Sequence, residues 1–347
     1  MKKLKRLTAI ISTVILTSSL FVGCGSTDPS KVINVFNCGD YIDMDLINKF
    51  QDETGYKVVY STYDTNEIMY SKVKSGSTKY DLVFPSDYMV EKMISEGLAE
   101  KLDFNNIPNY KYIGDNYKNL SYDPTNEYSV PYMWGTIGLI YDPEVVKEDN
   151  ITWDILWDEK YKDNTIMFNS LRDAFGISLS RLGYSMNSTN EKEVKEAADE
   201  LLKQKQLARA WMVDEVKDAM LNREAAIATV WSGDANYIIN EDPTLKYLVP
   251  ETGSNKWFDA MVIPTGAKNK EGAEAFINFL TDPENALQNV EYIGYYTPNT
   301  ETYNMLDDKI KAEYPSDEIL DKCEIFKNLP DNILKFYSEE WTRVTGA

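Results

Sequence analysis

The chain has 347 residues, of which 36 are basic and 56 acidic, so its formal net charge at pH 7 is −20. This balance disfavours nucleic acid and anionic lipid as partners and suits a cationic ligand better. The sequence contains no histidine, which removes serine–histidine and cysteine–histidine triads, histidine general bases and ordinary zinc sites. Catalysis is therefore not expected, and neither a cofactor nor a metal is predicted.

The N-terminus predicts export. Four cations among the first six residues precede an apolar stretch over 7–22 that is too short for a membrane span. Gly23-Cys24 follows, and a small residue before cysteine is the pattern at which bacterial lipoprotein precursors receive lipid and are cleaved. We predict a signal peptide over 1–23, lipidation of Cys24, a flexible tether over 24–30 and an extracytoplasmic location on the cell membrane. The alternatives are an ordinary signal with an accidental cysteine and an uncleaved anchor.

Strands and helices are expected to alternate after the tether. Residues 31–36 alternate in polarity and are rich in β-branched side chains, which predicts a strand. Asp43 is expected to cap a helix that stops near Gly55. The pattern continues with a strand from Lys57 to Tyr60, a helix capped by Asn66, a strand over 81–84 and a helix ending at Gly97. Such alternation predicts a parallel α/β sheet, in which ligands sit beyond the carboxyl ends of the strands.

The run Ser129–Tyr141 is apolar, nearly uncharged and contains two glycines, so we expect it to cross into a second lobe. Helices and a buried strand follow, and residues 256–264 are expected to cross back. Both lobes are thus discontinuous in sequence. The predicted parts are lobe 1 over 31–136 and 259–312, lobe 2 over 137–258, and C-terminal helices over 313–347 that pack mainly on lobe 2.

Aromatic residues stand beside carboxylates or hydroxyls just after several predicted strands. The segments are Asp40-Tyr41, Ser86-Asp87-Tyr88, Trp231-Ser-Gly-Asp234, Trp257-Phe-Asp259 and Tyr295-Tyr296. A polyamine is an apolar chain interrupted by ammonium groups, so its site needs aromatic walls and N–H acceptors, each contact contributing on the order of 0.5–2 kcal/mol. The competing interpretation is that the aromatics are core or rim residues and that the acids are helix caps or solvated charges.

Other polar and cysteine-containing segments are expected to be structural. Asp43 and its acidic neighbours lack the glycine and distal glutamate of a calcium-binding EF-hand, and residues 266–272 lack the Lys-Ser/Thr of a phosphate-binding loop. Cys38 and Cys323 are the cysteines that remain once Cys24 is assigned to lipid. One disulfide and two free thiols are both compatible with their spacing.

The chain resembles the spermidine/putrescine-binding proteins of polyamine ABC importers from about Val32 almost to its C-terminus. The resemblance is carried by long strings rather than short motifs. They include Tyr60-Ser-Thr-Tyr-Asp-Thr-Asn-Glu67, Tyr80-Asp-Leu-Val-Phe-Pro-Ser86, Ser129-Val-Pro-Tyr-Met-Trp-Gly135, Leu182-Gly-Tyr184, Trp257-Phe-Asp259 and Ile293-Gly-Tyr-Tyr-Thr-Pro-Asn299.

This resemblance implies a type II periplasmic-binding-protein fold, with two α/β lobes joined by crossover strands and a ligand cleft between them. It implies a monomer that captures spermidine or putrescine and delivers it to an ABC permease and its ATPase. The positions that match ligand contacts of the family are Asp40, Tyr41, Ser86, Tyr88, Ser170, Asp173, Trp231, Trp257, Asp259 and Tyr295.

Departures from the family pattern leave the choice between spermidine and putrescine open. Cys38 stands where the family usually has a tryptophan wall, and Ser170 stands where spermidine binders can carry Asp. The C-terminal glutamine contact of the family aligns only loosely with Asn328 or Lys327. A binding protein for another cation or a neutral solute, a secreted glycosidase using two acids and a purely adhesive lipoprotein are the alternatives.

Overall fold

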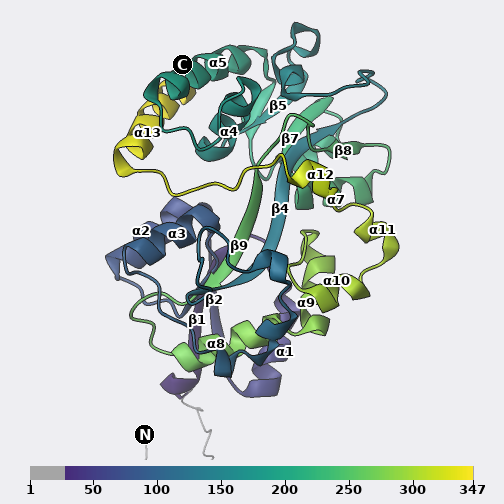
Figure 1. The fold of residues 1–347 in the computed structure, drawn as a ribbon. Coiled ribbons are helices and arrows are strands. Elements are labelled where there is room, and N and C mark those ends of the chain that lie inside the picture. Colours follow the sequence, from purple (N-terminus) through teal and green to yellow (C-terminus); the bar gives the residue numbers. More distant parts are fainter. Residues whose placement is uncertain (1–27, 347) are drawn as a thin grey trace, which may run out of the picture.

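The computed structural model describes residues 28–346, which form two α/β lobes stacked one above the other (Figure 1). One mixed sheet of nine strands runs through both lobes, in the order β2-β1-β3-β9-β4-β7-β5-β6, and β8 pairs with β4. We call the lower lobe of Figure 1 lobe 1 and the upper lobe lobe 2. The strands are β1 Val32–Cys38, β2 Lys57–Tyr63, β3 Leu82–Val83, β4 Ser129–Tyr141, β5 Thr165–Phe168, β6 Ala210–Met212, β7 Ile227–Trp231, β8 Lys246–Leu248 and β9 Lys256–Val262.

Each lobe has helices on both faces of its part of the sheet. In lobe 1, one core lies beneath α1, α8 and α9, and a second core lies beneath α2 and α3. In lobe 2, one core lies beneath α4, α5 and α13, and a second lies beneath α6 and α7. The helices are α1 Met44–Thr54, α2 Asn66–Ser75, α3 Asp87–Ser95, α4 Leu171–Arg181, α5 Glu191–Leu207, α6 Val216–Leu221, α7 Ser232–Glu241, α8 Lys270–Leu280, α9 Pro283–Ile293, α10 Thr300–Met305, α11 Asp308–Lys311, α12 Asp317–Leu320 and α13 Asp331–Thr345.

Helix ends in lobe 1 follow local chemistry. The Asp43 carboxylate accepts a hydrogen bond from the backbone N–H of Asp45 at 3.0 Å, and Gly55 ends α1 in the left-handed conformation, with φ 73°. The predicted cap of α2 was wrong by one residue. Thr65 is the cap, because its hydroxyl accepts from the backbone N–H of Ile68 at 3.3 Å. Asn66 is thereby left free to bond elsewhere, and its partner lies in the candidate site.

The prediction of a parallel sheet holds only for the outer strands. β1 pairs in parallel with β2 and β3, and β5 pairs in parallel with β6 and β7. The central pairs β3–β9, β4–β9 and β4–β7 are antiparallel. The physical reason is that β4 leaves lobe 1 and β9 returns to it, so two chain segments that cross the same gap must run in opposite directions.

The lobes are joined by the adjacent strands β4 and β9 and by a third segment. β4 pairs with β9 up to Thr136 and with β7 and β8 from Ile137 onward, so its two halves belong to different lobes. The chain from α10 through α11 to α12 passes from lobe 1 to lobe 2, as Figure 1 shows in yellow-green, and the yellow segment between α12 and α13 runs along the lower edge of lobe 2. Within residues 28–346, no helix is long and apolar enough to span a membrane.

Candidate functional site

Asp259 on β9 is the centre of the candidate site. One of its carboxylate oxygens, Oδ2, accepts a hydrogen bond from the Tyr41 hydroxyl at 2.7 Å. The other, Oδ1, is buried and has no hydrogen-bond partner among the described residues. Burial raises the pKa of Asp259 to about 6, although the hydroxyls of Ser86 and Tyr41 act in the opposite direction. A buried acceptor without a partner is costly, so this oxygen is a candidate contact for a ligand N–H.

Aromatic rings enclose this carboxylate. The ring of Tyr295 stands nearly perpendicular to the rings of Tyr41, at 5.7 Å, and Trp257, at 5.0 Å. The indole N–H of Trp257 is buried and has no hydrogen-bond partner among the described residues. Gly135 on β4 makes room for the indole, since a Cβ there would lie 2.5 Å from the Trp257 ring. The predicted residues Tyr41, Trp257, Asp259 and Tyr295 therefore form one cluster.

Ser86 and Tyr88 extend the cluster along α3. Ser86 lies opposite Asp259 in an isolated antiparallel bridge. Its hydroxyl accepts from the Asn66 side-chain amide at 3.0 Å, while its backbone N–H donates to Asn66 Oδ1 at 3.0 Å. These two hydrogen bonds occupy the Asn66 side chain, which explains why Asn66 is not the helix cap. The Tyr88 hydroxyl donates to Glu67 at 3.0 Å, so its hydrogen is engaged while its oxygen can still accept a hydrogen bond.

Lobe 2 supplies Ser170 and Asp173 at the start of α4. Asp173 is only 9% exposed, and burial raises its pKa to about 6, against the influence of Ser170 and Arg172. The Arg172 guanidinium lies 5.3 Å from the centre of the Tyr88 ring. Arg172, next to Asp173 in α4 of lobe 2, thus contacts Tyr88 of lobe 1.

Trp231 ends β7 on the lobe 2 side, and its ring lies 4.7 Å from that of Phe168. The chain then turns into α7 through Gly233, where a Cβ would lie 2.4 Å from the Tyr295 ring. Gly233 therefore lets the two lobes approach closely beside Tyr295. Trp231 and Tyr295 also both pack against the apolar core cluster that contains Trp257.

Asp40, in the loop after β1, is exposed and is the most exposed of the predicted ligand contacts. Sequence reasoning left two residues out of the predicted set: Asp234, which is buried, and Lys217, whose ammonium lies 3.5 Å from the Asp234 carboxylate. The segment Trp231-Ser-Gly-Asp234 contained a signal for Asp234, whereas nothing in the sequence singled out Lys217.

The two cysteines of the described chain are free thiols. Burial and the nearby charge of Asp259 raise the pKa of Cys38 to about 12, so it stays protonated at neutral pH. Within residues 28–346, no group of three or more histidine, cysteine, aspartate or glutamate residues is placed to hold a metal ion.

The lobes contact one another around the cluster. Besides the Arg172–Tyr88 contact, the side-chain amide of Asn236 donates to the backbone carbonyl of Gly294 at 2.9 Å. The backbone N–H of Asn328, in the segment before α13, donates to Glu91 of α3 at 2.8 Å. The candidate site is therefore enclosed by elements from both lobes.

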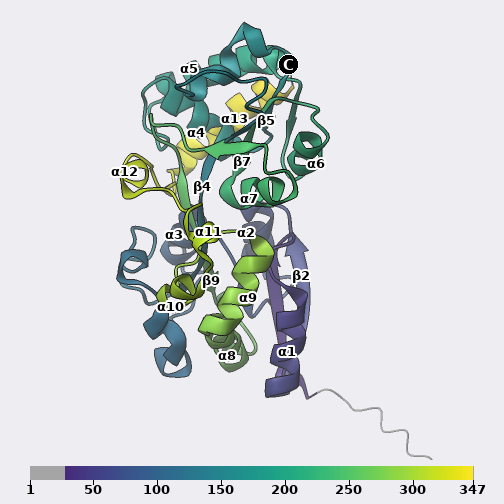
Figure 2. The same cartoon turned by 90° about the vertical axis from the view of Figure 1, so that its right-hand side faces the viewer.

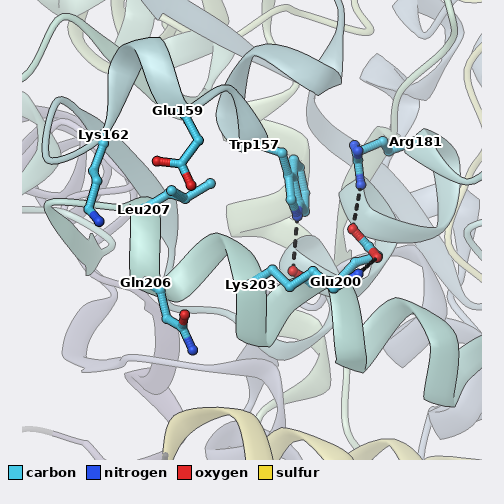
Figure 3. Close-up of a pocket in the computed structure, with 8 residues that line it drawn as sticks. All are labelled: Trp157, Glu159, Lys162, Arg181, Glu200, Lys203, Gln206 and Leu207. Carbon is cyan, nitrogen blue, oxygen red and sulfur yellow. Dashed lines mark hydrogen bonds and ion pairs between the residues drawn. The ribbon is translucent and has the colours of Figure 1, made fainter.

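A surface hollow of about 410 Å³ lies elsewhere, on lobe 2 (Figure 3). Arg181 stacks on Trp157, with 4.5 Å between guanidinium and ring centre, and pairs with Glu200 at 2.8 Å. Lys203 pairs with the same carboxylate. None of the predicted site residues lines this hollow, and these three charges at its wall are already paired with one another.

Known proteins match this chain over almost its whole length. A spermidine/putrescine-binding periplasmic protein of Salmonella typhimurium is 36% identical over 334 residues, which cover 95% of this chain and 96% of that protein. A putrescine-binding periplasmic protein of Pseudomonas aeruginosa is 32% identical over 369 residues, covering 99% of this chain and 100% of that protein.

Solved structures of related proteins also match this chain over almost its whole length. A structure described as a putative spermidine/putrescine ABC transporter from Listeria monocytogenes matches with a TM-score of 0.87 and 40% identity, over 91% of this chain and 99% of that one. The TpPotD lipoprotein of Treponema pallidum matches with a TM-score of 0.82 and 27% identity, over 90% and 99%. The predicted type II periplasmic-binding-protein fold is confirmed. Residues 45–319 match the family model described as bacterial extracellular solute-binding protein, and the chain belongs to that family.

Proposed function

We propose that this protein captures a polyamine, spermidine or putrescine, outside the cell and delivers it to an ABC importer. The observation that carries the proposal is the buried Oδ1 of Asp259, which has no partner among the described residues and lies within a box of aromatic rings. An ammonium group supplies N–H donors to such an oxygen, and its charge is attracted to the ring faces. The names of the relatives in Salmonella typhimurium and Pseudomonas aeruginosa support the same ligand class.

In this proposal the ligand lies between the lobes. Asp259 with Tyr41 contacts one ammonium group, Asp173 with Ser170 contacts another, and Tyr295 lies along the carbon chain between them. Ser86, Tyr88, Trp231 and Trp257 form walls, and Asp40 stands at the entrance. The lobe boundaries predicted from the sequence define the two bodies that close. Opening requires hinge movement in β4, β9 and the chain from α10 to α12, and the closed form presents a surface to a permease driven by an ATPase. The protein acts as a monomer and catalyses no reaction.

Titration calorimetry tests the proposal. Putrescine, spermidine or cadaverine should bind with a Kd near 1 μM, which corresponds to roughly −8 kcal/mol. A matched control is 1,4-butanediol, which has the carbon chain of putrescine and no charge, and it should not bind detectably. Absence of heat with all three amines at millimolar concentration, or equal binding of the diol, would exclude the proposed ligand.

Other functions make different predictions for the same site. A receptor for a neutral solute would bind equally well when the site carboxylates are neutralised. A glycosidase would hydrolyse a glycoside, with two carboxyl groups about 5–10 Å apart across a sugar ring. The relatives identified above are binding proteins, which favours binding over catalysis. An adhesive lipoprotein would not bind any of these small molecules.

We also propose that Cys24 carries the lipid that holds the protein at the membrane, although this residue lies outside the described part of the chain. The support is the Gly23-Cys24 junction after an apolar stretch. Replacing Cys24 with Ala should move the protein from the membrane fraction to the soluble fraction and abolish incorporation of labelled palmitate in cells. Replacing Cys323, which is buried in the folded part, should change neither result. Unchanged labelling of the Cys24 variant would refute the anchor.

A further inference from the structure

Four buried carboxylates lie near the proposed ligand position. Asp87 is already engaged, because its two oxygens accept from the backbone N–H groups of Tyr88 and Phe258, and the other three differ in their ion pairs. Asp173 is 9% exposed, Asp234 is 8% exposed, and the Oδ1 of Asp259 is buried. Among the described residues, no Lys or Arg nitrogen lies within ion-pair distance of Asp173 or Asp259. Asp234 has such a partner, because the ammonium of Lys217 lies 3.5 Å from its Oδ1. One of the three charges is thus already neutralised from within the chain.

Asp234 belongs to the same site as the other two. It follows Gly233, whose backbone touches the Tyr295 ring. Burial raises the pKa of Tyr295 well above its usual value, and the charges of Asp234 and Asp259 raise it further, in that order. Tyr295 is therefore close enough to both carboxylates for their charges to act on it. A ligand ammonium that passed the Tyr295 ring toward Gly233 would meet Asp234 and, with it, Lys217.

Lys217 is in the first turn of α6, which packs on α7. Figure 2 shows α7 at the underside of lobe 2, above lobe 1, and α6 beside it at the flank of lobe 2. Its side chain is 29% exposed, and the charges of Asp214 and Asp40 act on it in addition to that of Asp234. Asp214 and Asp40 are exposed, so water screens them and they offer a ligand less than the buried carboxylates do.

The other cation of the site has a different role. Arg172 lies beside Asp173, but its guanidinium donates to the backbone carbonyl of Lys327 and to the side chain of Asn187, both at 3.1 Å. It also lies 4.5 Å from the centre of the Phe326 ring. Arg172 is therefore fixed by its own contacts, and Asp173 keeps its carboxylate for a ligand.

We propose that Lys217 is a specificity-determining residue that favours a diamine over a triamine. Its ammonium takes the position at Asp234 that a third ligand ammonium would occupy, which leaves Asp173 and Asp259 for two. Putrescine, with two ammonium groups, matches this arrangement, whereas spermidine brings a third positive charge close to Lys217. This inference rests on the polyamine binding proposed above.

The test compares Lys217→Met and Lys217→Arg with the unmodified protein by calorimetry, at one ionic strength, with putrescine and spermidine. Lys217→Met should lower the ratio of the spermidine Kd to the putrescine Kd by about tenfold, the equivalent of 1.4 kcal/mol. Lys217→Arg should keep the ratio within about twofold, because the charge is retained. Adding Asp234→Asn to Lys217→Met should return the ratio toward that of the unmodified protein, as expected of two coupled residues.

Lys335→Met is the matched control. It removes the same charge from an exposed pair with Glu339, 3.7 Å apart on α13, and should leave the ratio unchanged. An unchanged ratio in Lys217→Met, or an equal change in Lys335→Met, would refute the role of Lys217. If the unmodified protein bound neither amine, the proposed function itself would fail, and the two failures are therefore distinguishable.

Discussion

Replacing Asp259 with Asn should weaken polyamine binding by at least about a hundredfold while making the unliganded protein more stable. Asparagine removes the negative charge from the oxygen that would accept a hydrogen bond from a ligand ammonium. Loss of such a charge-assisted hydrogen bond in a buried site costs about 2–4 kcal/mol. Asparagine keeps the shape and can still accept from the Tyr41 hydroxyl. Calorimetry with putrescine and spermidine measures the loss of affinity.

The gain in stability follows from the raised pKa of Asp259, about 6 in the folded protein against an ordinary value of 3.8. The folded state holds its proton more tightly than the unfolded chain does, so ionisation destabilises the fold as pH rises from about 4 to 6. Well above pH 6 the Asn variant should therefore be more stable by about 3 kcal/mol, and below pH 4 the difference should vanish. Urea denaturation at pH 7 and pH 4 measures this.

Asp43→Asn is the control for both measurements. Asp43 caps α1 and accepts a hydrogen bond from Gln288 at 2.7 Å, and asparagine is an equally good cap. Neither affinity nor stability should change much. If Asp259→Asn bound polyamines as tightly as the unmodified protein, the central position of Asp259 in the site would be wrong.

Polyamine affinity should fall by about a hundredfold between pH 7.5 and pH 5. Asp173, Asp234 and Asp259 each have a pKa of about 6, raised mainly by burial. Primary ammonium groups stay protonated over this range, so the protein alone titrates. Each carboxyl group that must lose its proton on binding weakens affinity by about tenfold per pH unit below its pKa, and two such groups give the expected change.

Calorimetry at pH 5, 6 and 7.5 measures this dependence, and the slope of log Kd against pH counts the protons released. In Asp259→Asn the slope below pH 6 should be smaller by about one proton. Binding that did not vary with pH, or that tightened in acid, would contradict a site built on ionised carboxylates. The same protonation stabilises the unliganded fold, so thermal stability and affinity should move in opposite directions over this pH range.

Features set by neighbours in the chain were predictable from the sequence. Asp43 and Gly55 mark the ends of α1 because a cap and a left-handed turn depend on a few adjacent atoms. The run Ser129–Tyr141 forms one strand through both lobes, as its uniform apolar character predicted. The long strings also identified the family, and the predicted aromatic residues Tyr41, Trp257 and Tyr295 lie beside Asp259.

Tertiary structure alone decided the contacts between distant residues. Thr65 rather than Asn66 caps α2 because Asn66 bonds to Ser86, and the direction of the central strands follows from two segments crossing one gap. The same holds for the pairing of Lys217 with Asp234 and for the absence of a partner at Asp259 Oδ1 among the described residues. Sequence supplied the chemical groups of the site. Their burial and partners, which set their charge and therefore their ligand, depend on which surfaces the folded lobes bring together.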